Sequence, residues 1–216
     1  MALSDTTLSK LISKEKLKIS NNNFDFDKTF PKDSKKRLHY YKYMNKLGFK
    51  DNEVQKLSFD GRQIESGSID LRLGNSFSKI ATNKSIVKLG EKINYQEISE
   101  NPIIYPGEYM LGTTQETIFL PSNIAATVDG RSSIGRIGLH VENAGWVDPG
   151  FEGEITLELF NSGNIAIELV PGYRVCQLVF EKTNTKPTFP YNGKYQNQKD
   201  ATGSKTYKDY DIKEML

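Results

Sequence analysis

The chain has 216 residues, of which 37% are hydrophobic, so it can bury the core of one domain beneath a very polar surface. Lys and Arg number 29 against 27 Asp and Glu; this near balance argues against a protein that coats nucleic acid, and no stable nucleic-acid binding is expected. One cysteine and two histidines exclude a disulfide framework within the chain and argue against a His/Cys zinc site.

The N-terminal 65 residues predict helices packed on the same domain as the rest of the chain. Ser4 or Asp5 can cap a helix whose apolar side carries Leu8, Leu11 and Ile12. Residues 20–33 are polar and predict a loop. The first twenty residues contain no signal peptide, and the chain has no apolar run near eighteen residues, so a cytoplasmic location with no membrane contact is expected.

A second helix is predicted over residues 34–47. Its apolar side would carry Leu38, Tyr41, Met44 and Leu47, and Gly48 is a natural stop. The Lys- and Tyr-rich composition permits contact with nucleic acid, but a solvated helix lying on the domain is the favoured interpretation.

From residue 69 onward, short apolar runs alternate with turn residues every eight to twelve positions. The predicted strands are 68–74, 85–90, 108–114, 116–121, 124–130, 154–160, 165–170 and 175–180. Many short strands at this spacing predict a mainly β fold, an antiparallel sandwich or barrel with a few short helices. After Glu181 the chain is polar, which predicts either a disordered tail or a segment that orders on a ligand.

The run at 154–160 places one candidate catalytic carboxylate. In a strand, Ile155, Leu157 and Leu159 share one face, while Glu154, Thr156 and Glu158 share the other. An exposed polar face is the simpler interpretation. The functional alternative is that Glu158 points into a pocket as a general base, taking a proton from water and returning it to a leaving amine.

A second carboxylate, Asp148, precedes Pro149-Gly150. Asp before Pro-Gly forms turns readily, so a structural role is open. Equally open is an acid that orients a sugar hydroxyl or a hydrolytic water, with Trp146 and Phe151 as core residues or as walls for a ring.

A polar cluster follows the Asp-Gly turn at 129–130. Its hydroxyls and guanidiniums suit phosphate oxygens, and its members are Arg131, Ser132, Ser133 and Arg136. His140 is interpreted as a structural histidine. The tail adds aromatic, cationic and amide groups that could close over a charged ligand, namely Tyr191, Lys194, Tyr195 and Gln198.

Together these stretches resemble the dCTP deaminases, in the superfamily that they share with the trimeric dUTPases. The resemblance covers about residues 66–204 and rests on six blocks: SGSIDLRLGNSF (66–77), YPGEYMLGTT (105–114), LPSNIAATVDGRSSIGRIGL (120–139), AGWVDPGFEGEITLELFNSG (144–163), PGYRVCQLVFE (171–181) and PYNGKYQNQ (190–198). It implies an N-terminal region over 1–65 with an insertion at about 21–60 that ordinary members lack, a dUTPase-like core over 66–182, and a tail over 183–216 that closes on the nucleotide.

The resemblance also implies a distorted β-barrel or jelly roll, assembled as a homotrimer with active sites between subunits. By position, Glu158 would be the glutamate that activates water, Ser132 would lie beside that water, and Arg136 would support the glutamate. Arg131 and Ser133 would bind phosphate, Asp148 would meet the deoxyribose 3′ hydroxyl, and the tail would cover the triphosphate. Mg²⁺ would be bound through the phosphates. Zinc deaminases need a His/Cys cluster that this chain cannot supply.

Three departures bear on the substrate. Gly145-Trp146 resembles the bifunctional members that release dUMP and pyrophosphate, in which Asp148 would also help to activate water. Asn143, before Ala144, is familiar from the dUTPases, and the connection from Gly138 to Asp148 is one residue shorter than in most deaminases. Asn143, Ala144 and Trp146 would contact the substrate. Deamination of dCTP is expected, giving dUTP, or dUMP and diphosphate if the protein is bifunctional. The alternatives are dUTP hydrolysis without deamination and a non-catalytic trimeric nucleotide-binding module.

Overall fold

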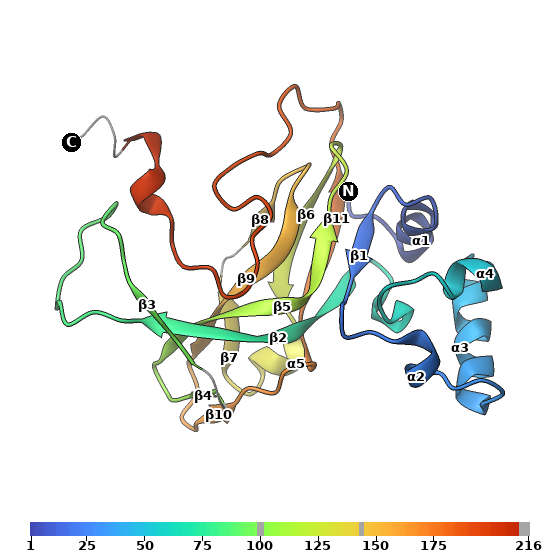
Figure 1. The fold of residues 1–216 in the computed structure, drawn as a ribbon, viewed down its shortest axis with the longest axis horizontal. Coiled ribbons are helices and arrows are strands. Elements are labelled where there is room, and N and C mark those ends of the chain that lie inside the picture. The colour runs from blue at the N-terminus through green and yellow to red at the C-terminus, as the bar shows by residue number, and fades with distance from the viewer. Residues whose placement is uncertain (99–101, 143–144, 212–216) are drawn as a thin grey trace.

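The computed structural model describes residues 1–98, 102–142 and 145–211 (Figure 1). In chain order the elements are α1 (Asp5–Ser13), β1 (Lys18–Ser20), α2 (Phe26–Thr29), α3 (Lys35–Lys46), α4 (Asp51–Val54), the 3-10 turn η1 (Gly61–Gln63), β2 (Ile69–Ile80), β3 (Tyr95–Glu97), β4 (Ile103–Ile104), β5 (Tyr109–Phe119), β6 (Ile124–Gly130), α5 (Ser132–Gly135), β7 (Leu139–Glu142), β8 (Trp146–Val147), β9 (Glu152–Asn161), β10 (Ile167–Glu168), β11 (Arg174–Lys182) and η2 (Thr206–Lys208).

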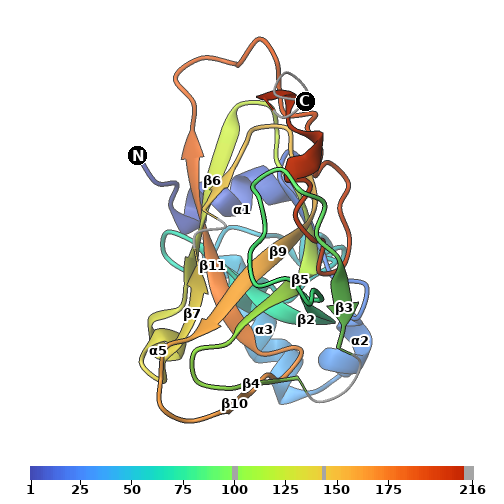
Figure 2. The same cartoon turned by 90° about the vertical axis from the view of Figure 1, so that its left-hand side faces the viewer.

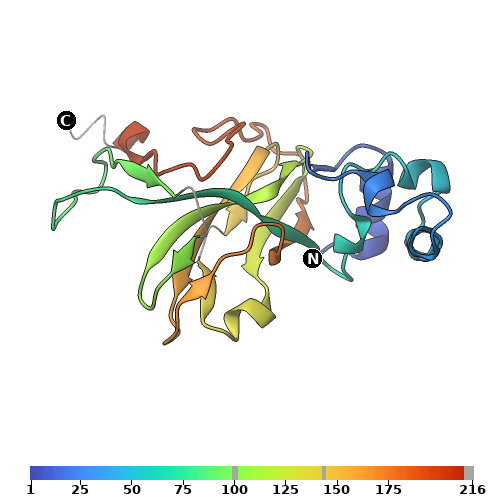
Figure 3. The same ribbon diagram turned by 60° about the horizontal axis from the view of Figure 1, so that its bottom comes forward.

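One large antiparallel sheet carries the fold. Its strands run in the order β7-β9-β5-β2-β11-β6-β8, with β1 added to β5 and β3 added to β2, while β4 and β10 form a separate small pair. The sheet curls into a half-barrel (Figures 1 and 3). The prediction of a mainly β, antiparallel fold with a few short helices is confirmed.

The strand predictions hold where a run buries one face and fail where it does not. The runs at 108–114 and 116–121 form the single strand β5, whose pairing with β9 shifts register between Thr113 and Thr117. The strand predicted at 85–90 is wrong: Ile86 and Leu89 are 83% and 89% exposed, so this apolar run has no sheet to pack against. Short strands such as β3, β7 and β8 were too brief to leave a pattern.

The N-terminal helices gather at one end of the sheet (Figures 1 and 3). Helix α1 forms as predicted, with Leu8 and Ile12 buried. The loop predicted over 20–33 is partly wrong, because Asp25 caps the one-turn helix α2 by accepting a hydrogen bond from the Lys28 amide. In α3 the buried residues are Tyr40 and Met44, whereas Leu38, predicted on the apolar side, is 56% exposed.

Aromatic packing explains why the buried face of α3 is rotated from the predicted one. Phe30, which follows α2, is 1% exposed and stacks on Tyr40 with ring centroids 3.9 Å apart. The Tyr40 hydroxyl also accepts a hydrogen bond from the Gly61 amide at 2.8 Å. Tyr40 therefore faces the domain, and its neighbour two positions earlier, Leu38, faces solvent.

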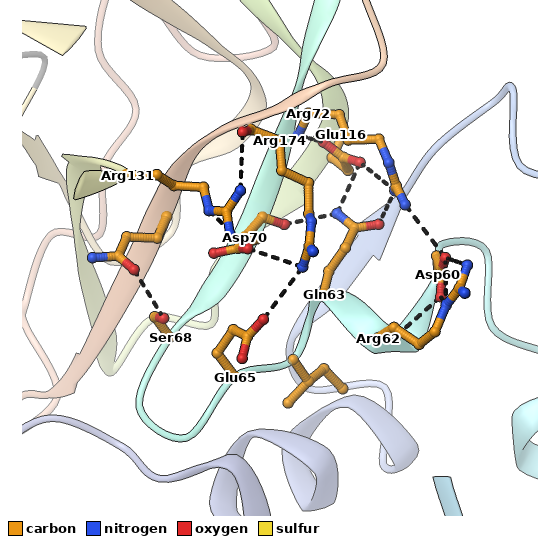
Figure 4. A network of polar contacts seen from close by, with 12 residues as sticks. Asp60, Arg62, Gln63, Glu65, Ser68, Asp70, Arg72, Glu116, Arg131 and Arg174 are labelled. Atoms are coloured by element: carbon orange, nitrogen blue, oxygen red, sulfur yellow. Dashed lines mark hydrogen bonds and ion pairs between the residues drawn. The ribbon is translucent and has the colours of Figure 1, made fainter. Parts of the chain in front are cut away.

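A buried carboxylate joins the N-terminal region to the sheet. Glu116 on β5 is 0% exposed and accepts hydrogen bonds from the Arg72 amide at 2.8 Å and from Gln63 Nε2 at 3.0 Å (Figure 4). Asn21 Nδ2 donates to the same carboxylate at 3.4 Å. Because a buried charge without partners is costly, these contacts fix residues 21 and 61–63 against β2 and β5.

Candidate active site

A cleft of about 500 Å³ lies between the sheet and the C-terminal segment. Its walls come from β5, β8, β9, the turn after β8 and residues 191–206, which run alongside β9 and β3 (Figure 2). Six of the predicted site residues line the cleft: Glu158, Asp148, Trp146, Tyr191, Tyr195 and Gln198. Residues distant in sequence thus meet in one cleft.

Glu158 reaches the cleft because β9 alternates as the sequence predicts. Leu157 and Leu159 are fully buried on one face, and Glu158 is half-buried on the other. In the sheet Glu158 lies opposite Leu111 on one side and Glu142 on the other. Burial raises the pKa of Glu158, and the negative charge of Glu142 raises it further. A carboxyl with a raised pKa is suited to exchange protons near neutral pH.

Asp148 occupies a tight turn with its carboxylate at the cleft. The Phe151 amide donates to the Asp148 carbonyl at 3.1 Å, and Gly150 takes a φ of +93°, which favours glycine. The side chain does not close an Asx turn; Oδ1 instead accepts the Trp146 indole N–H at 3.0 Å. Within the described residues, Oδ2 accepts no hydrogen bond. One carboxylate oxygen is therefore fixed and the other can accept a bond from a ligand or water.

Aromatic rings form much of the cleft wall. Trp146 is 57% exposed, and Phe151 packs against Tyr191 with centroids 5.9 Å apart. Tyr109 and Tyr95 also line the cleft; burial raises the pKa of Tyr109, and the charge of Glu158 adds to the effect, so its phenol stays protonated. Flat rings around two carboxylates suit a heterocyclic or sugar ring that carries exchangeable protons.

The C-terminal segment is docked on the chain's own sheet. Gln198 Nε2 donates to the Glu154 carbonyl at 2.8 Å, and the Asp200 amide donates to the Glu154 carboxylate at 2.8 Å. The Ser204 amide donates to the Tyr95 hydroxyl at 3.1 Å. The described part of the tail, up to residue 211, lies against the sheet, and residues between 191 and 206 line the cleft. Lys194 does not line the cleft: it pairs with Asp209.

The predicted phosphate loop lies elsewhere in the single chain. Arg131 directly precedes α5 and makes no side-chain capping hydrogen bond; Ser132 and Ser133 on α5 and Arg136 after it are exposed. None of these residues lines the cleft, and α5 lies far from the C-terminal segment (Figures 1 and 2). One chain therefore does not bring Ser132 or Arg136 to its own Glu158. Asn143 and Ala144, also predicted to contact substrate, lie outside the described residues.

The exposed His140 does not line the cleft, and its Nε2 is 2.8 Å from Ser162 Oγ. The cleft residues that the sequence did not predict include Tyr95, Tyr109, Thr202 and Ser204. Of these only Tyr109 left a signal, since strand alternation puts it on the same face as Leu111, the neighbour of Glu158.

Neither a metal cluster nor a membrane span emerges from the described part of the chain. Within residues 1–98, 102–142 and 145–211, no three His, Cys, Asp or Glu side chains come together to hold a metal ion. Over the same ranges, every helix is too short or too polar to cross a bilayer.

Comparison with known proteins shows which family this chain resembles. The family model described as dCTP deaminase-like matches residues 44–183. A protein of Sulfurihydrogenibium sp. named "dCTP deaminase, dUMP-forming" is 46% identical over 158 residues, covering 70% of this chain and 88% of its own. One of the same name from Aquifex aeolicus is 44% identical over 163 residues, covering 74% and 91% respectively.

A solved structure shares the fold. The 2′-deoxycytidine 5′-triphosphate deaminase of Agrobacterium tumefaciens aligns with a TM-score of 0.51 and 18% sequence identity. The alignment covers 83% of this chain and 47% of that longer chain. At this identity the likeness concerns the arrangement of the strands alone.

Proposed function

The chain belongs to the dCTP deaminase family, and from this premise we propose that it deaminates dCTP and releases dUMP and diphosphate in pyrimidine deoxynucleotide metabolism. The observation that carries the proposal is the meeting of Glu158 and Asp148 at one aromatic cleft. Two carboxylates in different surroundings suit two successive hydrolytic steps.

In the first step, Glu158 acts as general base. It takes a proton from water, the oxygen attacks the amino-bearing carbon of the cytosine, and a tetrahedral intermediate forms. Glu158 then passes the proton to the amino group, the carbon–nitrogen bond breaks, and ammonia leaves. The raised pKa of Glu158 supports this role, because the same carboxyl must both accept and return a proton.

In the second step, water cleaves the bond between the α- and β-phosphates. Asp148 orients this water and the deoxyribose 3′ hydroxyl, since its Oδ1 is fixed by Trp146 and the residue lines the cleft. The names of the relatives, which include dUMP as product, support this second step. Gly145-Trp146 in the sequence supports it too.

The site is completed between chains of a homotrimer. The exposure of Ser132, Ser133 and Arg136 on α5, away from the chain's own cleft, supports this assembly, because a neighbouring chain can contact them. They would then bind phosphate and support the neighbour's Glu158 and its water. Tyr191, Tyr195 and Gln198 would cover the nucleotide from within the chain, and Lys194 would join them on exchanging Asp209 for a phosphate.

The substrate is the magnesium complex of dCTP, in which the ion neutralises phosphate charge. Deamination by Glu158 needs no zinc, and the chain's single cysteine and two histidines support a zinc-independent mechanism. A cytoplasmic location suits such a metabolic enzyme.

One incubation tests the proposal. Purified protein is given dCTP and Mg²⁺, and nucleotide, ammonia and diphosphate are quantified together. Equal amounts of dUMP, ammonia and diphosphate are expected. In Asp148→Asn, diphosphate release should fall by about 10²–10⁴-fold, the usual contribution of such a group. Turnover of dUTP without ammonia release from dCTP would instead identify a diphosphatase, and tight dCTP binding with no product would identify a binding module.

A further inference from the structure

A buried acid outside the cleft contacts the predicted phosphate loop. Asp70 on β2 is 2% exposed, and the mechanism above does not use it. Its carboxylate oxygen Oδ2 lies 3.1 Å from Arg131 Nε and 3.0 Å from Arg174 Nη1 (Figure 4). A buried carboxylate paired with two guanidiniums is costly to assemble, so its purpose needs an explanation.

The backbone of Asp70 is fixed as firmly as its side chain. Gln63 Nε2 donates to the Asp70 carbonyl at 2.7 Å, and the same amide donates to the buried Glu116. The contacts through Gln63 tie Asp70 to the buried network at the end of β2 (Figure 4). Asp70 therefore offers a rigid anchor for whatever it holds.

Asp70 and the Arg174 carbonyl together hold the guanidinium of Arg131. Nε of Arg131 pairs with Asp70, and its Nη1 donates to the Arg174 carbonyl at 3.3 Å. The Arg131 amide donates to the Val175 carbonyl at 3.0 Å, so both backbone and side chain are fixed. Among the described residues Nη2 has no partner, and the side chain is 26% exposed. Arg131 therefore keeps a donor available on a partly exposed side chain, and the two residues that follow it, Ser132 and Ser133, are exposed.

A guanidinium that is fixed through Nε and Nη1 and keeps Nη2 available is suited to phosphate. Arginine recognises phosphate through parallel N–H groups in a plane, and a plane that is fixed in advance loses less freedom on binding. We infer that Asp70 is a positioning residue that holds Arg131 ready for the triphosphate of the substrate. The inference rests on the proposed function for the identity of the ligand, and it assigns Asp70 no contact with substrate.

The test measures triphosphate binding apart from turnover. Affinity for inorganic triphosphate is measured by calorimetry on the assembled protein, for Asp70→Asn, Arg131→Met and the double variant. Asp70→Asn is expected to weaken binding about tenfold, the loss of one charge-assisted contact. It should raise KM for dCTP similarly and leave kcat within about twofold. In the Arg131→Met background, Asp70→Asn should add less than about twofold, because its effect passes through Arg131.

Glu65→Gln is the matched control. Glu65 pairs with Arg174 at 3.3 Å, as Asp70 does, but has no contact with Arg131. It should leave triphosphate affinity unchanged. Two results would overturn the inference. An equal loss of triphosphate affinity in Glu65→Gln would show a nonspecific effect of charge, and independent losses that multiply in the double variant would show that Asp70 does not act through Arg131.

Arg131→Lys keeps the test decisive if Asp70→Asn unfolds. Lysine keeps the charge but cannot meet Asp70, the Arg174 carbonyl and a phosphate together. It should lose about tenfold in triphosphate affinity, and unchanged affinity would refute positioning. Absence of ammonia release in the wild-type protein would reject the proposed function alone, because triphosphate binding would still depend on Asp70 and Arg131.

Discussion

Replacement of Phe30 by alanine tests whether the N-terminal region and the half-barrel unfold as one unit. Phe30 is 1% exposed, stacks on Tyr40 at 3.9 Å, and lies 5.1 Å from the Arg62 guanidinium. Loss of a buried phenyl ring costs about 3–5 kcal/mol, and the loss of stacking favours the upper half of that range. At a denaturant slope of about 3 kcal/mol per molar, the urea midpoint should fall by roughly 1.3–1.7 M.

Two probes report the two parts of the molecule. Circular dichroism follows the helices, and fluorescence follows Trp146, the single tryptophan, which lines the cleft. At fixed protein concentration both midpoints should fall together, because Glu116 links the N-terminal region to β5. Phe189→Ala, at an 89% exposed ring, is the control and should shift neither. A fall by dichroism with unchanged fluorescence would refute a single cooperative unit.

Two further predictions concern the cleft. Since burial and then Glu142 raise the pKa of Glu158, and the base must be ionised, the acidic limb of kcat/KM should lie above pH 4.5. Glu142→Gln should move that limb to lower pH, and an unmoved or raised limb would contradict the pairing. Tyr95→Phe removes the acceptor of the Ser204 amide at 3.1 Å, so amide exchange at residues 198–206 should quicken about two- to tenfold. Tyr105→Phe, at an exposed ring, is its control. Equal exchange rates in both variants would show that the Tyr95 hydroxyl does not hold the C-terminal segment in place.

The sequence predicted those parts of the fold in which the spacing of the apolar residues matches the face that the structure buries. The alternation of apolar and polar residues in 154–160 placed Glu158 correctly, because Leu157 and Leu159 are buried in the core and Glu158 lies on the opposite face of the strand. The strand at 85–90 failed because hydrophobicity alone does not supply a neighbouring strand, and Leu38 was misplaced because Tyr40 stacks on Phe30 from a segment read as loop.

The site divides along similar lines. Glu158, Asp148 and the tail line one cleft of the chain, and each was a candidate from the sequence, whereas Tyr95 reaches the cleft only through the pairing of β3 with β2. The pairing of Asp70 with Arg131 joins two residues sixty-one positions apart. Local sequence patterns cannot predict a contact between residues so far apart in the chain.

The central claim is that the Glu158 carboxylate deaminates dCTP, and ammonia release by Glu158→Gln tests it most directly. The substitution keeps the shape of the side chain and removes its basicity, so release should fall by about 10²–10⁴-fold or more. Glu152→Gln, at an exposed position of the same strand, should release ammonia at the wild-type rate. Wild-type ammonia release by a folded Glu158→Gln protein would contradict the account.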